Sequence, residues 1–272
     1  MSAQAGTAII GGGIVGLCVA LGLAARGHEV LVLDGRDGDM RASQGNFGLV
    51  WLQGKGAGYA PYARWSFQAV QAWPDFAKRL SGLVDVDLAL CQQGGYEFFT
   101  DAAEYEAFGH DLHRQANALE DRLSFELLNH ADLAARLPGI GQRVVGASFC
   151  PLDGHVNPLR LHFALRQACL ASGVRITGGA SVVSVRPAGA GFALLDETGR
   201  QTRASRVVLR AGTTKSRVSS RKSPASCINA AVIPAATTGD TPVAVFGKVA
   251  PPRASQAART SSCSCVGAPA MR

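Results

Sequence analysis

Near its start the chain has two short apolar runs with a longer apolar run between them. Thr7–Ile10 and the stretch from His28 to Asp34 are rich in Ile, Val and Leu, which predicts two buried strands. Between them, residues 14–26 have the length and composition of a helix, and Gly27 stops it. A strand, a helix and a second strand in this order indicate a β-α-β unit.

Apolar spacing predicts two helical regions further along. Pro61–Gly82 has helical spacing, with Pro74 either starting or kinking a helix. Ala102–Asn129 is charged and is interpreted as a solvated pair of helices.

The later part of the body combines one clear helix with short strands. Asn157 is a good N-cap and Pro158 a good first residue for a helix that runs to about Ser172 and stops at Gly173. Short apolar runs predict strands at Gly94–Thr100, Val174–Ile176, Ala180–Val185, Phe192–Leu195 and Ser205–Leu209. This order is that of a nucleotide-binding α/β domain that resumes after an inserted one.

The charge of the chain is unevenly distributed. The 272 residues have a formal net charge of +7, but residues 1–212 hold 19 basic and 19 acidic side chains, while residues 213–272 hold 8 and 1. A balanced body argues against a nucleic-acid partner, which requires Lys and Arg clustered on a folded face. The 7 cysteines are odd in number and lack metal-ligand spacing, so we expect no metal, a reducing compartment and a cytoplasmic protein.

The glycines Gly11, Gly13 and Gly16 carry the first sign of chemistry. Gly11 permits a tight turn after the first strand, and Gly13 lets the backbone approach a pyrophosphate. Gly16 lets the helix pack closely on the sheet, and the N-terminus of that helix offers N–H groups to phosphates. Asp34 follows Gly16 at a spacing where a carboxylate binds a ribose hydroxyl. The apolar stretch from Ala8 to Ala25 would otherwise be a marginal membrane anchor, an interpretation that leaves its glycines unexplained.

Four segments of the chain stand out together: "AIIGGGIVGLCVALGLAARGHEVLVLD", "PLDGHVNPLRLHFALRQACLASGVRI", "GASVVSV" and "RVVLRAG". In this order they resemble the D-amino acid oxidase family of FAD-dependent oxidoreductases. Within the family, "RASQGNFGLVWLQGKG" is most similar to the flavoprotein subunits of opine oxidases and D-hydroxyproline dehydrogenases. The resemblance implies an α/β fold. Its Rossmann-like FAD-binding domain would be discontinuous (1–85 and 146–212), with a partial α+β substrate domain (86–145) inserted and a basic tail (213–272).

The resemblance also assigns residues to FAD. It implies that Gly11, Gly13 and Gly16 hold the pyrophosphate and that Asp34 holds the ribose. It implies that Arg41, Ala42 and Ser43 contact the flavin's phosphate and ribityl side, and that Asn46, Phe47, Gly48 and Leu49 approach the isoalloxazine. Val182 would meet the adenine through its backbone, and Ala211 with Gly212 would close the site. For residues 43–49 an ordinary loop, and for Val182 plain core packing, stay open as alternatives. Arg210 departs from the family, in which a small residue is usual there.

The activity implied by the resemblance is oxidation of the C–N bond of a small amino or imino acid, by hydride transfer to the flavin. No catalytic side chain is nominated, and the histidines at 110, 113, 155 and 162 are interpreted as surface or helix residues. The implied partners are the substrate and electron-transfer subunits. Alternatives are an inactive FAD-binding remnant, a subunit that needs partner chains, and a membrane-anchored or basic binding protein.

Residues 213–272 differ from the body in composition. They contain no leucine and a single aromatic residue, Phe246. A segment so poor in large apolar side chains cannot offset the entropy of ordering, so we expect it to be mostly disordered. Because the composition changes directly after "VVLRAG", we expect that the reading frame shifts there and that a truncated protein results.

Overall fold

The computed structural model describes residues 3–35, 42–209 and 232–233. The sequence-based predictions for Arg41, Arg210, Ala211, Gly212 and the basic tail therefore lie outside the described residues.

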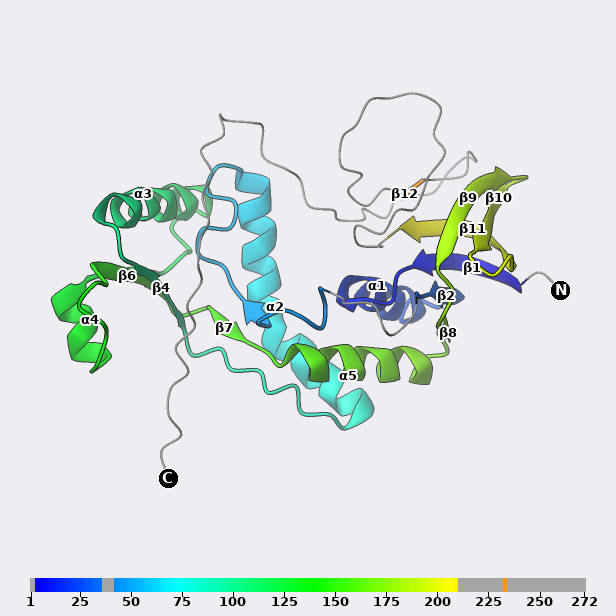
Figure 1. Cartoon of the computed structure of the whole chain (residues 1–272), viewed down its shortest axis with the longest axis horizontal. Coiled ribbons are helices and arrows are strands. Elements are labelled where there is room, and N and C mark those ends of the chain that lie inside the picture. Colours follow the sequence, from blue (N-terminus) through cyan, green and yellow to red (C-terminus); the bar gives the residue numbers. More distant parts are fainter. Residues whose placement is uncertain (1–2, 36–41, 210–231, 234–272) are drawn as a thin grey trace.

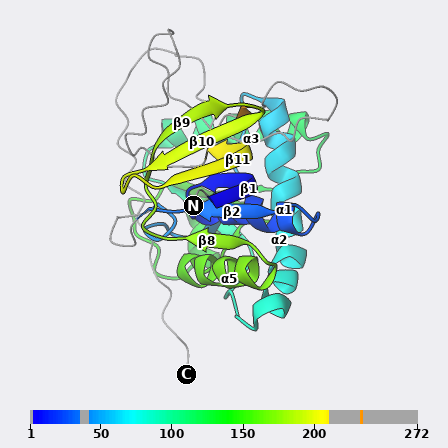
Figure 2. The same cartoon turned by 90° about the vertical axis from the view of Figure 1, so that its right-hand side faces the viewer.

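A seven-stranded sheet forms one end of the molecule (Figure 1 and Figure 2). Its order is β8-β2-β1-β11-β10-β9, and β12 pairs with β11. β1 lies between β2 and β11 and runs parallel to both, while β10 is antiparallel to its neighbours β9 and β11. The strands are β1 (Ala3–Ile10), β2 (Val30–Leu33), β8 (Arg175–Thr177), β9 (Val182–Ala188), β10 (Gly191–Asp196), β11 (Gln201–Leu209) and β12 (Val232–Ile233).

β1 is buried on both faces. Successive side chains of a strand point to opposite sides, and those of β1 enter a different core on each side. Ile9 belongs to the core shared with helices α1 (Ile14–Ala24) and α5 (Pro158–Ala171). Ala8 and Ile10 belong to a second core on the other side, with Phe192 and Leu194 of β10. The short apolar run at the start of the chain is therefore a central strand.

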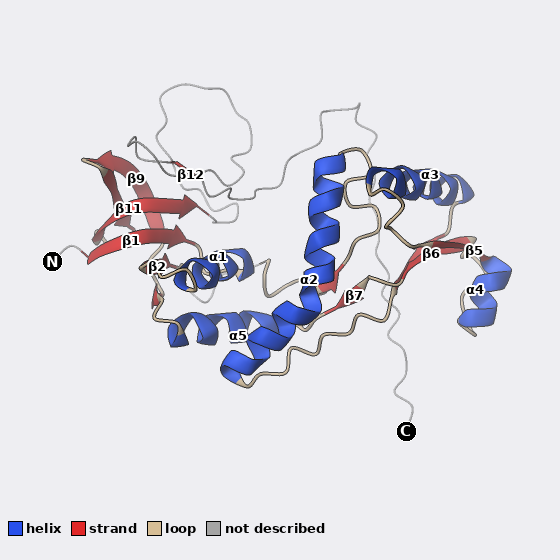
Figure 3. Ribbon diagram, turned by 180° about the vertical axis from the view of Figure 1, so that it is seen from behind, coloured by secondary structure: helices blue, strands red, loops and turns tan. Residues whose placement is uncertain are grey.

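A smaller antiparallel sheet lies at the other end of the molecule, with the long helix α2 (Ala60–Val84) between the two sheets (Figure 1 and Figure 3). Its order is β4-β6-β5, and helices α3 and α4 pack on it. Its elements are β4 (Gly95–Phe99), α3 (Ala102–Ala118), β5 (Glu126–Asn129), α4 (His130–Arg136) and β6 (Gly146–Cys150). A separate two-stranded pair joins β3 (Leu49–Val50) to β7 (Gly154–His155).

The α/β class and the order of most elements are confirmed, whereas the second helix expected within 102–129 is wrong. Residues 126–129 form β5, which pairs with β6 and buries Leu128 beside Leu133 of α4. The expected domain boundaries stay a prediction; β6, which begins at residue 146, pairs with β4 and β5.

None of the helices in the described part of the chain combines the length and the hydropathy that crossing a bilayer requires. The stretch from Ala8 to Ala25, which the sequence left open as an anchor, divides into the end of β1, a turn and the 11-residue helix α1.

Candidate functional site

The turn between β1 and α1 depends on its first and last glycines. Gly11 has a φ of 106°, in the region that favours glycine, and its N–H donates to the carbonyl of Leu33 over 2.9 Å. A Cβ on Gly16 would overlap the carbonyl oxygen of Gly11. The absence of a side chain at Gly16 therefore lets α1 start directly against the end of β1.

Gly13 has no side chain, which lets the Ser43 hydroxyl come close to the N-terminus of α1. It is the N-cap of the helix and makes no side-chain capping bond. The next N–H, that of Ile14, donates to the hydroxyl oxygen of Ser43 over 3.1 Å. A Cβ on Gly13 would come within 2.9 Å of the same oxygen. The first turn of α1 thus presents its N–H groups and the positive end of its dipole where Gly13 has no side chain.

Asp34 follows β2 and reaches back to the glycine turn. Its carboxylate oxygen Oδ1 accepts from the N–H of Gly12 over 2.8 Å and from that of Gly35 over 3.1 Å. The backbone carbonyl of Asp34 accepts from the N–H of Ala180 over 2.7 Å. This bond brings the segment that leads into Val182 and β9 to the carboxyl end of β2.

His162 completes the turn from the other side, through a contact that no sequence pattern indicated. Its Nε2 lies 2.9 Å from the carbonyl oxygen of Gly12. His162 is a helix residue, as interpreted from the sequence, but it is half-buried and touches a residue 150 positions earlier in the chain. Local patterns do not report contacts at such a separation.

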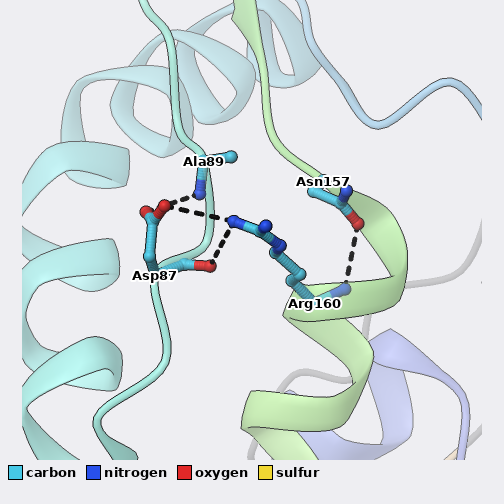
Figure 4. A network of polar contacts seen from close by, with 4 residues as sticks. All are labelled: Asp87, Ala89, Asn157 and Arg160. Carbon is cyan, nitrogen blue, oxygen red and sulfur yellow. Dashed lines mark hydrogen bonds and ion pairs between the residues drawn. The ribbon is translucent and has the colours of Figure 1, made fainter.

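The start of α5, which carries His162, is tied down by capping and by one ion pair (Figure 4). The side-chain oxygen of Asn157 accepts from the N–H groups of Leu159 and Arg160 over 3.1 and 3.0 Å. The guanidinium of Arg160 lies 3.1 Å from the Asp87 carboxylate, which also accepts from the N–H of Ala89. The position of His162 is therefore set by the capped helix and its link to the chain after α2.

The segment expected to approach the flavin is a compact turn packed on β7. The Asn46 side chain accepts from the N–H of Gly48 over 2.7 Å and donates to the carbonyl of Ala42 over 2.9 Å. Gly48 has a φ of 69°, and a Cβ there would overlap the carbonyl oxygen of Val156. Phe47 and Leu49 are 66% and 50% exposed. Two apolar side chains are thus presented to the outside by a fixed backbone.

Buried polar side chains hold the chain just after β3. The Gln115 amide donates to the carbonyls of Leu52 and Lys55 over 2.9 Å each, and its oxygen accepts from the N–H of Gly54. Asp153 accepts from the N–H of Leu52 over 2.5 Å, and burial raises the pKa of its carboxyl to about 6. Sequence reasoning named neither side chain, although Asp153 lies in the quoted "PLDGHVNP".

Most of the predicted site residues that the structure describes gather in two places. Gly11, Gly13, Asp34 and Ser43 surround the start of α1, with Gly16 packing that helix on β1. Residues 46–49 lie together at the β3–β7 pair. Helix N–H groups, a backbone without side chains at Gly12 and Gly13, and a carboxylate at the end of the next strand match the needs of a dinucleotide pyrophosphate and its ribose. The residues present therefore fit the adenosine half of FAD.

Comparison with known proteins gives consistent matches. A family model described as FAD-dependent oxidoreductase (DAO) matches residues 7–228. The chain is 42% identical over 205 residues to a subunit of the opine oxidase of Rhizobium meliloti, and 41% identical to the corresponding subunit from Agrobacterium tumefaciens (strain Ach5). Each alignment covers 75% of this chain and 55% of the relative, so the chain spans about half the length of these curated relatives. The crystal structure of glycine oxidase from Bacillus cereus superposes with a TM-score of 0.66 at 25% identity, over 77% of this chain and 55% of that one.

Proposed function

Since the chain belongs to the DAO family of FAD-dependent oxidoreductases, we propose that it binds FAD at the glycine turn and takes part in oxidising the C–N bond of a small amino or imino acid. The observation that carries the proposal is the set of groups around the start of α1: the N–H groups at the helix N-terminus, the absence of a side chain at Gly13 and the Asp34 carboxylate.

The residues of this chain have distinct tasks in the proposal. The N–H groups of the first turn of α1, together with the Ser43 hydroxyl, hold the pyrophosphate, and Asp34 accepts from the ribose hydroxyls. Arg41, Ala211 and Gly212 are proposed to contact the cofactor as well. When bound, FAD supplies the acceptor for the hydride that leaves the substrate carbon.

The exposed apolar side chains at the β3–β7 pair form the proposed flavin side of the site. Phe47 and Leu49 offer apolar surface on a backbone held by Asn46 and by the close contact of Gly48 with Val156. Such a surface excludes water and orients a flat ring without taking part in bond changes.

The names of the relatives support a substrate class and an assembly. Two relatives at 41–42% identity are named as subunits of opine oxidases, and the similar crystal structure is a glycine oxidase. These names support a substrate of the opine or glycine type, and the family resemblance adds sarcosine and D-hydroxyproline to the proposed class. Because these relatives are named as subunits, we also propose partner chains, which receive the electrons.

The first test is the visible absorption spectrum of the purified chain with FAD. We expect a protein-bound flavin spectrum that bleaches when glycine, sarcosine, D-hydroxyproline or an opine is added without oxygen. Bound flavin that no such compound bleaches would contradict the reaction for the chain alone; bleaching that requires a partner subunit would establish the assembly.

A matched pair of glycine variants on one helix tests the location of the cofactor. Gly13 has a φ of −72°, which any residue adopts, so Gly13→Ala should fold while its methyl group intrudes beside the Ser43 hydroxyl at the start of α1. We expect it to weaken FAD binding at least tenfold, about 1.4 kcal/mol. In Gly22→Ala, the new Cβ meets only the end of the Arg26 side chain at 3.7 Å, so FAD affinity should not change. Equal affinities in the two variants would contradict the site.

A further inference from the structure

We propose that His162 is a positioning residue for the cofactor turn: it holds the carbonyl of Gly12 and thereby directs the N–H of Gly13 toward the pyrophosphate. The inference rests on the proposed FAD binding. It begins from one contact, the 2.9 Å separation between Nε2 of His162 and the Gly12 oxygen.

The contact identifies which ring nitrogen carries the proton. A carbonyl oxygen can only accept a hydrogen bond, so the Nε2 atom of His162 must be the donor. The ring is therefore protonated at Nε2, whether or not Nδ1 is protonated as well. An imidazole protonated at Nδ1 alone would place two acceptors 2.9 Å apart.

Holding the Gly12 carbonyl also sets the direction of the next N–H group. The Gly12–Gly13 peptide is planar and trans, so its C=O and its N–H point in opposite directions. An anchor on the oxygen from α5 aims the Gly13 N–H away from α5. This N–H belongs to the N-cap of α1, at the space where a methyl group would approach Ser43.

This peptide unit needs an anchor more than most others. It joins two glycines, whose backbone dihedrals are the least restricted of any residue, so a peptide between them can rotate with little steric cost. Asp34 already fixes the preceding peptide through the N–H of Gly12, at 2.8 Å. His162 fixes the following one, and the two side chains together hold both sides of Gly12. An ordered turn spares FAD the entropy of ordering it.

The test compares FAD affinity in the 272-residue chain and in its His162 variants. His162→Leu removes the donor, and His162→Gln restores one, because the glutamine amide nitrogen occupies nearly the place of Nε2. We expect His162→Leu to weaken FAD binding about threefold to tenfold and His162→Gln to recover most of it. His110→Leu, an exposed histidine on α3, is the control and should bind as the original chain does. His162→Leu with unchanged affinity, or His162→Gln as weak as His162→Leu, would overturn the proposal.

A second readout does not involve the cofactor. Nitrogen-15 NMR of the imidazole rings in the chain without FAD should show a proton on Nε2 of His162, assigned by its loss in His162→Gln. A ring protonated only at Nδ1 would overturn the inference. If the original chain binds no FAD, the proposed function fails, whereas the NMR result still decides the His162 contact.

Discussion

At the scale of single residues, the carboxyl of Asp153 is a buried group with only one of its two oxygens hydrogen-bonded within the described residues. Asp153 has no exposed surface. Its Oδ1 accepts from the N–H of Leu52, while Oδ2 has no hydrogen-bond partner within the described ranges. Burial raises the pKa of the carboxyl to about 6, against the lowering effect of the hydrogen bond from the Leu52 N–H. At neutral pH the folded chain therefore contains an incompletely paired buried carboxylate.

The raised pKa of Asp153 predicts how stability depends on pH. The folded state binds this proton more tightly than the unfolded state, in which the pKa of the carboxyl is near 3.8. Protonated Asp153 therefore makes its full contribution to the free energy of unfolding below pH 3.8, and this contribution is lost as the pH rises through 6. The loss amounts to at most about 3 kcal/mol. We expect Asp153→Asn to gain stability relative to the original chain between about pH 4.5 and 7.5, measured as urea midpoints. Asp75→Asn on the exposed face of α2 is the control, and parallel pH profiles for Asp153→Asn and the original chain would contradict the expectation.

Single residues differ in how far the sequence could predict them. The turn glycines and Asp34 were predictable because their roles follow from spacing within one β-α-β unit. His162 and Gln115 were not, since the backbone groups they contact lie 150 and about 60 residues away. Such contacts follow from the packing of α5 and α3, which the local sequence does not encode.

At the scale of elements, α2 shows how a proline is accommodated in a 25-residue helix. Pro74 has no N–H, so the carbonyl of Val70, four residues earlier, loses its helical partner. The side-chain amide of Gln92 donates to that carbonyl over 3.1 Å and also to the carbonyl of Leu152 over 2.9 Å. Figure 1 shows α2 changing direction along its length. Gln92 therefore donates a hydrogen bond to the carbonyl that Pro74 leaves without its helical partner.

A double-mutant cycle tests this account of the kink. We expect Gln92→Leu to destabilise the chain by about 1–3 kcal/mol, because it leaves two carbonyls without a donor. In a Pro74→Ala background the new N–H can donate to Val70, so the same change at Gln92 should cost less. Both values come from chemical denaturation. If the cost of Gln92→Leu is equal in the two backgrounds, Gln92 does not compensate for Pro74.

Elements with a strong period and a clear cap were predictable, and short ones were not. α5 begins at Pro158 after the Asn157 cap and ends before Gly173, as the sequence indicated. The sequence predicts helix where β5 forms, because the four residues 126–129 are too few to show alternation of apolar and polar side chains within a charged helical segment. Only its pairing with β6 decides its structure.

At the scale of the whole molecule, the large sheet joins the two ends of the described body. β1 pairs in parallel with β11 in a register that aligns Ile9 with Val208 and Ile10 with Leu209. The lobe of β4, β5 and β6 is inserted between them in the sequence. The sequence predicted the interruption of the nucleotide-binding domain, but only the register shows which strands adjoin β1.

Two matched substitutions test how far the fold depends on this pairing. Val208 is 6% exposed and packs in the core shared with α1 and α5, so Val208→Asp buries a charge and should abolish cooperative folding. Val183 on the edge strand β9 is 44% exposed, and Val183→Asp should cost no more than about 1 kcal/mol. Circular dichroism and thermal melting provide the readout. A folded Val208→Asp chain would show that the fold does not depend on an apolar side chain at this position of β11.

The distance in sequence between β1 and β11 also has a consequence for biosynthesis. A ribosome adds about 5–20 residues each second, so roughly 10–40 s pass between the emergence of β1 and that of its partner. Throughout that interval the nascent chain carries an apolar strand with an unpaired edge. The cofactor turn that follows β1 is among the first segments translated but among the last to gain its final support, which makes the growing polypeptide a natural client for chaperones at the exit tunnel.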